Sequence, residues 1–366
     1  MKKFWNRNKN LIILLIVWRF VLFIIEKVSP FIIPLHDGYN GPIPWANHDG
    51  IHYLTIAREG YFQYSEAFFP LYPLFLNMIS KLGVIQPWVS AAFASFVLFS
   101  SAILLLFNTL YDENKNTAWW TALFFIVFPT SFFFCAVYSE SLFFFLSVLV
   151  FLFTKKRLWF WASVFGALAS ATRLFGVLLF FYVSLEYLFT KEKKRNIWDI
   201  CFIFMIPIGL LSYMAYLYMR SGDPLLFFHI QPAFGANRSG STLILLPQVI
   251  WRYIKIIVTA FLQPTPASYF ISVMELLAAF FGYILLCIGW KQKERWSLLL
   301  YGLATLSLPS LTGTFSSMPR YLLSIFPLFF ILGKLDNTVV RYWLLVIFIL
   351  LQIILSAMFL RGWFVA

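Results

Sequence analysis

The stretch LIILLIVWRFVLFIIEKV, residues 11–28, is an apolar run long enough to cross a membrane as a helix. It follows the basic start MKKFWNRNKN, and no small-residue cleavage site comes after it, so we expect a retained first span rather than a signal peptide. Among all 366 residues, 61% are hydrophobic and only 12% are charged, whereas a soluble domain carries about 25% charged residues. With a mean hydropathy of +0.82, this composition predicts a single all-α, polytopic integral membrane domain over residues 1–366.

Ten further apolar runs predict a total of eleven spans. The later ones lie near 88–110, 118–135, 138–153, 158–172, 174–190, 198–219, 268–289, 296–311, 320–333 and 342–360. Short basic turns separate several of them, namely KKR at 155–157, KEKKR at 191–195 and KQKER at 291–295. If the N-terminus is cytoplasmic, all these turns fall on the cytoplasmic side, as basic loops do. We therefore expect the C-terminus outside, together with loops 29–69 and 220–267, and we interpret the net charge of +13 as a topology signal rather than a nucleic-acid site.

The ionisable residues that remain lie almost entirely on the predicted outer side. Glu140, Arg173 and Arg320 each stand at the end of a predicted span, in YSESLFFF, ASATRLFG and SSMPRYLL. Charges near membrane depth cost about 2.5–3.5 kcal/mol on insertion scales, so they persist where they line a cavity, do chemistry or snorkel to the interface. A loop carboxylate can take a proton from a hydroxyl, and arginines can hold a phosphate. The set suits group transfer from a lipid-phosphate donor, and a transporter could carry the same inventory.

Four segments resemble motifs of one enzyme family. HDGIHYLTIAREGY (48–61), followed by AFFPLYPLFL (67–76), resembles the first-loop signature of the GPI mannosyltransferase II (PIG-V) family and its bacterial relatives. FPTSFFFCAVYSESLFFF (128–145), GALASATRLFG (166–176) and SMPRYLLSIFPLF (317–329) are similar to later motifs of the same family. One departure is visible, because the family has tryptophan directly before the aspartate and this chain has His48. That substitution leaves Asp49 intact and bears on how an acceptor packs.

The resemblance implies the GT-C class of multi-span glycosyltransferases. Such an enzyme moves a sugar, usually mannose, from a polyprenyl- or dolichyl-phosphate donor to an acceptor hydroxyl on the outer or lumenal side, with inversion. By this resemblance Asp49 is the expected catalytic base. We expect Arg173 and Arg320 to bind the donor phosphate, and Glu140 with Tyr138 to orient the sugar or to hold Arg173. For Glu140 a purely structural ion pair is the alternative.

We expect His48, His52, Gln231 and Arg238 to contact acceptor or donor, with solvated loop positions as the alternative for Gln231 and Arg238. His48 and His52 with Asp49 suggest a metal but lack a clear third ligand, so no cofactor is predicted and a divalent metal stays an unsupported alternative. The expected partners are the lipid bilayer, a polyprenyl-phosphate sugar donor and a glycolipid, polymer or protein acceptor, without nucleic acid. The short basic turns and compact length favour a bacterial plasma membrane over the ER membrane of a eukaryote.

The rival function is a transporter or flippase of a lipid-linked saccharide. Transporters tend to show repeated halves and broken or charged helices near mid-membrane. Neither feature is clear in this sequence, whose polar residues collect on one predicted side. The enzyme is therefore the preferred interpretation.

Overall fold

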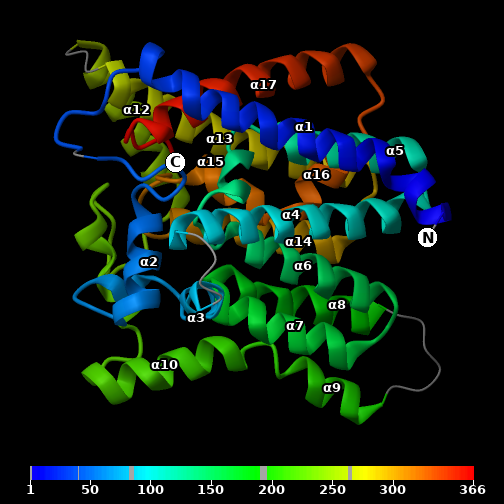
Figure 1. Cartoon of the computed structure of the whole chain (residues 1–366). Coiled ribbons are helices and arrows are strands. Elements are labelled where there is room, and N and C mark those ends of the chain that lie inside the picture. The colour runs from blue at the N-terminus through cyan, green and yellow to red at the C-terminus, as the bar shows by residue number, and fades with distance from the viewer. Residues whose placement is uncertain (1, 40, 82–85, 190–195, 263–265) are drawn as a thin grey trace.

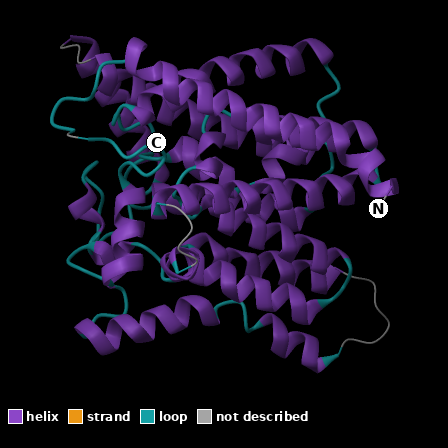
Figure 2. Ribbon diagram, viewed as in Figure 1, coloured by secondary structure: helices purple, strands orange, loops and turns teal. Residues whose placement is uncertain are grey.

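The computed structural model describes residues 2–39, 41–81, 86–189, 196–262 and 266–366, and within these ranges the chain is helical, without a strand (Figures 1 and 2). The expected all-α class is thus confirmed. In chain order the α-helices are α1 (Lys2–Ile32), α2 (Asp49–Glu59), α3 (Leu71–Ser80), α4 (Pro87–Tyr111), α5 (Lys115–Val127), α6 (Glu140–Lys155), α7 (Trp159–Thr172), α8 (Leu179–Phe189), α9 (Ile197–Ile203), α10 (Ile208–Ser221), α11 (Leu226–His229), α12 (Leu246–Leu262), α13 (Pro266–Lys291), α14 (Trp296–Ser310), α15 (Met318–Tyr321), α16 (Phe326–Gly333) and α17 (Thr338–Leu360). Short 3-10 turns are η1 (Ser65–Ala67), η2 (Ser131–Cys135), η3 (Leu174–Leu178), η4 (Gln231–Phe234) and η5 (Leu322–Ser324). The basic run 191–195 and residues 263–265 of the expected outer loop 220–267 lie outside the described residues.

The long helices run between two ends of the molecule, and several basic turns gather at the end that holds the N-terminus (Figure 1). There Arg7 forms an ion pair with Asp112 at 2.9 Å, and Lys155 forms one with Glu113 at 2.6 Å. A cavity of about 490 Å³ at this end collects charged side chains from four separate turns, including Glu113, Lys155, Arg295, Lys334 and Arg341. The sequence predicts that the basic turns share one side of the membrane, and a cluster of this kind at one end is consistent with that prediction. Which compartment each end faces stays a prediction.

Three helical segments of the described chain are long and apolar enough to cross a membrane, judged by length and composition. They are α4, α17 and residues Tyr269–Lys291 of α13. A fourth span results if α9 and α10, which bend by 46° at their break, count as one. Other predicted spans contain shorter helices than the apolar runs suggested, because α5 has 13 residues, α7 has 14 and α16 has 8. The eleven-span count and the sides of the termini therefore stay predictions.

Proline explains why the predicted span 118–135 is broken. Helix α5 ends because Pro129 disfavours helical backbone at the residue before it, and Phe128 takes ψ 141° instead. The irregular segment 128–139 that follows is buried throughout. Non-helical backbone at membrane depth is tolerated where it packs inside protein or lines a cavity. This segment leads directly into Glu140, the first residue of α6.

A close backbone approach explains the turn after α7. Gly176 in η3 lies so near α7 that an added Cβ would stand 2.2 Å from the carbonyl carbon of Ala169. No larger residue fits at this position without moving the backbone. The tight return of η3 leaves Arg173 with an extended backbone (φ −155°, ψ 150°) between two helical elements. The sequence GALASATRLFG therefore forms the end of α7 and a tight turn, with Arg173 at the junction.

Candidate active site

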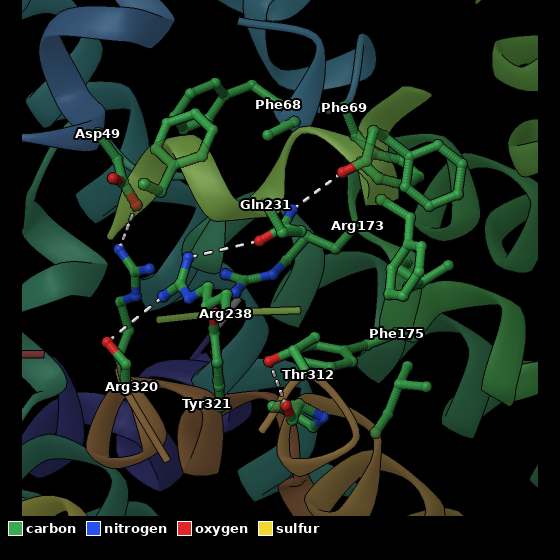
Figure 3. A pocket seen from close by; sticks show the side chains of 18 of the residues that line it. Asp49, Phe68, Phe69, Arg173, Phe175, Gln231, Arg238, Thr312, Arg320 and Tyr321 are labelled. Atoms are coloured by element: carbon green, nitrogen blue, oxygen red, sulfur yellow. Dashed lines mark hydrogen bonds and ion pairs between the residues drawn. The ribbon is translucent and has the colours of Figure 1, made fainter. Parts of the chain in front are cut away.

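A pocket of about 200 Å³ is lined in part by Asp49 and Tyr53 of α2. In Figure 1 this helix lies at the end of the molecule opposite the N-terminus, and Figure 3 shows the pocket from close by. Its charged and amide side chains are Asp49, Arg173, Gln231, Arg238 and Arg320. Its aromatic lining includes Phe68, Phe69, Phe175, Phe227, Phe228, Phe234 and Tyr321. In Figure 3 the arginines gather near Asp49 and Gln231, and Phe69 and Phe175 lie beyond Arg173, whose guanidinium carbon is 5.4 Å from the centre of the Phe175 ring. The pocket thus has a charged half and an aromatic half, and five residues expected from the sequence line the charged half.

A row of ion pairs with alternating charges lies in and behind one wall of this pocket. Arg320 Nη1 lies 2.6 Å from Asp49 Oδ2, and Arg320 Nε lies 3.4 Å from Glu140 Oε1. Glu140 also makes a close ion pair with Arg173. The Glu140 side chain is only 1% exposed, against 28% for Asp49, so it sits behind the arginines and is not among the residues that line the pocket. This arrangement fits Glu140 as a holder of two arginines better than as a sugar contact.

Arg238 reaches the same half from the loop after η4. Its guanidinium donates to Gln231 Oε1 and to Ser316 Oγ, both at 3.4 Å. Gln231 in turn donates from its amide to the carbonyl of Phe227 at 2.9 Å. Both residues therefore have defined partners on the pocket wall rather than free positions in a solvated loop.

The electrostatics keep Asp49 ionised. Burial raises the pKa of Asp49, but the charge of Arg320 and its hydrogen bond outweigh burial, so the pKa lies below its ordinary value of 3.8. Arg238 lowers it further. Burial mainly lowers the pKa of His48, so that imidazole is neutral at neutral pH. An ionised carboxylate therefore faces the pocket and is able to accept a proton.

The residues just before Asp49 are held by hydrogen bonds to the irregular segment before α6 and to the end of α17. Val137 N donates to the carbonyl of Trp45 at 2.7 Å, and Tyr138 OH donates to the carbonyl of Asn47 at 2.8 Å. The Asn47 side chain donates to the carbonyl of Phe359 at 2.7 Å, at the end of α17. Residues 45–47 are fixed in this way just before Asp49 begins α2.

Besides Glu140, three residues expected at the site do not line the pocket. Tyr138 is 2% exposed, and its ring lies 5.2 Å from the guanidinium carbon of Arg320. His48 packs among the rings of Tyr39, Phe359 and Phe364. His52 stacks on Phe62 and Phe68 with ring centroids 5.8 and 5.1 Å away. Tyr138 supports the pocket from behind, and the two histidines belong to aromatic packing beside it.

Tyr138→Phe tests this placement of the hydroxyl. The variant loses the hydrogen bond to Asn47 but keeps the ring against Arg320. We expect unfolding free energy to fall by about 0.5–1.5 kcal/mol, with the Michaelis constant for a lipid-linked sugar unchanged. Thermal unfolding and transfer kinetics measure the two effects. Tyr218→Phe, at a residue that is 62% exposed, is the matched control. A rise in the Michaelis constant at unchanged stability would instead place the Tyr138 hydroxyl on the sugar.

Glu275 is a residue that the sequence reasoning missed. It is 5% exposed inside α13 and bonds to the loop that carries Ser316. A single acidic residue in an otherwise apolar helix was the available signal. For a metal, the part of the chain that the structure describes contains no group of three or more His, Cys, Asp or Glu side chains suited to hold one.

The helices and the pocket define a class, namely a helical membrane protein whose site suits a ligand that is anionic at one end and apolar at the other. The profile of the mannosyltransferase (PIG-V) family matches residues 36–221, half of the chain. The chain belongs to this family, and the resemblance seen in its motifs is confirmed. The matched range contains Asp49, Glu140 and Arg173, while Arg238, Glu275 and Arg320 come after it.

A curated relative is GPI mannosyltransferase 2 of Drosophila pseudoobscura pseudoobscura, which is 31% identical over a match that covers 33% of this chain and 33% of the relative. The chain thus spans about a third of the length of that relative. Two crystal structures of the Archaeoglobus fulgidus oligosaccharyltransferase also match, one tethered with an acceptor peptide and one in complex with Zn and sulfate. They align with 94% and 93% of this chain and 55% and 52% of their own, at 13% and 14% identity and TM-scores of 0.44 and 0.41.

Proposed function

We propose that this protein is a membrane glycosyltransferase that moves a sugar, by family mannose, from a polyprenyl-phosphate sugar to an acceptor hydroxyl on the outer membrane face. The observation that carries the proposal is the pocket itself, in which an ionised carboxylate stands beside three arginines and an aromatic wall. Family membership supports mannose as the sugar and transfer as the reaction.

The charged half suits the phosphate of such a donor. Three arginines against one aspartate give the lining a formal charge of +2, and Glu140 behind it reduces this to +1. A sugar phosphodiester carries one negative charge, so binding it would neutralise the site. Guanidinium groups also match the phosphate oxygens geometrically, because each offers paired N–H donors. Arg173 and Arg320 are the proposed phosphate ligands, and Arg238 with Gln231 is proposed to contact the sugar or the acceptor.

The aromatic half suits the rest of the donor. Phe69, Phe175 and Phe227 offer apolar surface beside the arginines, as the start of a polyprenyl chain requires. Phe68 and Phe234 lie closer to His52 and pack edge to face, with centroids 5.6 Å apart. Aromatic faces stack on the apolar C–H face of a sugar ring, so these two are the proposed sugar platform.

The chemistry is a direct displacement. Asp49 takes the proton of the acceptor hydroxyl, and the oxygen attacks the anomeric carbon from the side opposite the phosphate. The bond from that carbon to the phosphate oxygen breaks, and the phosphate leaves with the electron pair while the arginines stabilise its charge. One displacement inverts the anomeric configuration. The products are the glycosylated acceptor and the polyprenyl phosphate.

Arg320 links donor binding to the proton transfer. Its bond to Asp49 lowers the basicity of the carboxylate in the empty pocket. A donor phosphate gives this guanidinium a third anion to bind, besides Asp49 and Glu140. This competition frees an oxygen of Asp49, and the added negative charge raises the pKa of Asp49. The base is thereby strengthened when the donor is in place.

The test is transfer by the full-length protein in liposomes, with radiolabelled polyprenyl-phosphate mannose beside glucose and galactose donors and a panel of glycolipid and peptide acceptors. We expect labelled acceptor together with an equal amount of polyprenyl phosphate, and release of that lipid phosphate reports the reaction whichever acceptor is used. Movement of intact donor across the bilayer, with no lipid phosphate released, would instead support the transporter or flippase. The plasma membrane of a bacterium is the proposed location, or the ER membrane if the source is a eukaryote.

A further inference from the structure

Glu275 is an acidic residue buried in a helix that is otherwise apolar. It lies in the segment Tyr269–Lys291 of α13, which is long and apolar enough to span a membrane, and it is 5% exposed. It neither lines the pocket nor falls within the range matched by the family profile. Carboxylates at membrane depth are unfavourable unless they are paired, and they mark functional sites more often than packing sites. The partners of Glu275 therefore indicate its role.

Both carboxylate oxygens of Glu275 accept hydrogen bonds. Oε2 accepts from the Tyr253 hydroxyl at 2.5 Å, and Oε1 accepts from the backbone N–H of Ser317 at 3.1 Å. Glu275 thus joins α13 to α12 and to the loop before α15.

Tyr253 continues the contact to the same loop. Its hydroxyl accepts from the backbone N–H of Phe315 at 3.1 Å and lies 3.1 Å from Thr314 Oγ1. The Glu275–Tyr253 pair therefore binds two backbone N–H groups of this loop, those of residues 315 and 317, and contacts the side chain of Thr314. The preceding residue on α12, Arg252, donates to the carbonyl of Gly313 at 2.9 Å. The loop 313–317 is held from one side along its length.

The loop needs such support because Ser317 has a positive φ of 66°. A left-handed backbone is uncommon for a residue other than glycine, and it persists where surrounding contacts over-determine it. The N–H that Glu275 binds belongs to this strained residue. The strain and the buried carboxylate therefore occur at one point of the loop.

The same loop delivers two groups to the pocket. Ser316 accepts from Arg238, and the carbonyl of Ser317 accepts the backbone N–H groups of Arg320 and Tyr321, each at 3.0 Å. The direction in which Arg320 leaves α15 therefore depends on the conformation of Ser317. A shift there moves the guanidinium that pairs with Asp49.

We propose that Glu275 and Tyr253 form a positioning pair that fixes loop 313–317 and thereby aims Arg320 at the phosphate of the donor. The activity readout of this proposal rests on the proposed transferase function. The pair acts through Arg320 and touches no substrate.

The experiment compares wild type with Glu275→Gln and Tyr253→Phe, both close in shape to the residues they replace. We expect each to raise the Michaelis constant for polyprenyl-phosphate mannose about tenfold, because Tyr253→Phe deletes the hydroxyl that binds the Phe315 N–H and Glu275→Gln replaces the oxygen that accepts from that hydroxyl. Since the two residues act as one unit, the double variant should lose less than the product of the two single effects. Tyr283→Phe is the control on the same helix, because its hydroxyl contacts Ser307 instead of the loop. A lower melting temperature with an unchanged Michaelis constant would reduce the pair to a packing role and overturn the proposal.

Hydrogen exchange of the same proteins, followed by mass spectrometry, separates this proposal from the transferase function. In Glu275→Gln the amides of residues 314–321 should exchange at least about tenfold faster, with α4 and α17 unchanged. If wild type transfers no sugar, the transferase proposal fails, while this exchange result still decides whether Glu275 fixes the loop. Unchanged exchange at 314–321 would overturn the positioning role even if transfer is normal.

Discussion

Asp49→Asn is expected to lower sugar transfer by about 10²- to 10⁴-fold while the protein still binds the lipid-phosphate donor. The amide has the shape of the carboxylate, and its oxygen can still accept from Arg320. It cannot take a proton from an acceptor hydroxyl. The variant also removes the only negative charge among the residues that line the described pocket, so donor affinity should stay the same or increase.

Turnover of radiolabelled polyprenyl-phosphate mannose, with separate determination of the turnover number and the Michaelis constant, measures this effect. The loss should fall on the turnover number, as expected for an interaction made in the transition state. Asp223→Asn is the matched control, because Asp223 is 32% exposed and bonds to His229 outside the pocket. If Asp49→Asn transfers sugar at the wild-type rate, Asp49 is not the base. If Asp223→Asn lowers the turnover number by as much, the loss reflects the removal of any negative charge and not of a catalytic base.

Glu140→Gln is expected to destabilise the protein by about 3–5 kcal/mol and to lower transfer as well. Glu140 is the buried anion between Arg173 and Arg320, whose side chains are 12% and 8% exposed. Removing its charge leaves two guanidinium groups close together with Asp49 as the remaining anion of the wall. Their repulsion should lower the free energy of unfolding and should also increase the distance between the two guanidinium groups that are proposed to hold the donor phosphate.

Thermal unfolding in detergent and donor kinetics on the folded fraction measure the two parts of this effect. Glu59→Gln is the control, since the pair of Glu59 with Arg58 spans 3.8 Å and both side chains are mostly exposed. Exposed pairs contribute about 0–1 kcal/mol, so this variant should behave as wild type. Wild-type stability in Glu140→Gln would mean that water or another group compensates the two arginines.

The sequence predicted the helical class and much of the charged half of the pocket, for physical reasons. Glu140, Arg173 and Arg320 stand out because a charge next to an apolar run is unfavourable without a role, whereas Asp49 was found through the motif that contains it. Their motifs also resemble those of one family. Segments far apart along the chain could therefore be assigned to one site before any contact was known.

Other features could not be read from the sequence. Tyr138 precedes Glu140 by two residues, yet spacing alone does not tell whether its hydroxyl turns to the pocket or to the Asn47 carbonyl. The number of spans was obscured because apolar composition looks alike in a crossing helix and in a buried irregular segment such as 128–139. Glu275 was missed because its partners, Tyr253 and the N–H of Ser317, belong to other elements and form no local pattern.

The pairing of Asp49 with Arg320 also bears on biogenesis, because the two residues are 271 positions apart in the chain. At about 5–20 residues per second, a ribosome needs roughly 15–50 s to add Arg320 after Asp49. Arg173, the partner of Glu140, is synthesised 33 residues after it. Arg320, the partner of Asp49, is synthesised only when nearly the whole chain has been made. A nascent chain stalled before residue 320 would therefore present Asp49 without the guanidinium that pairs with it. The charged half of the pocket is therefore completed only when nearly the whole chain has been made.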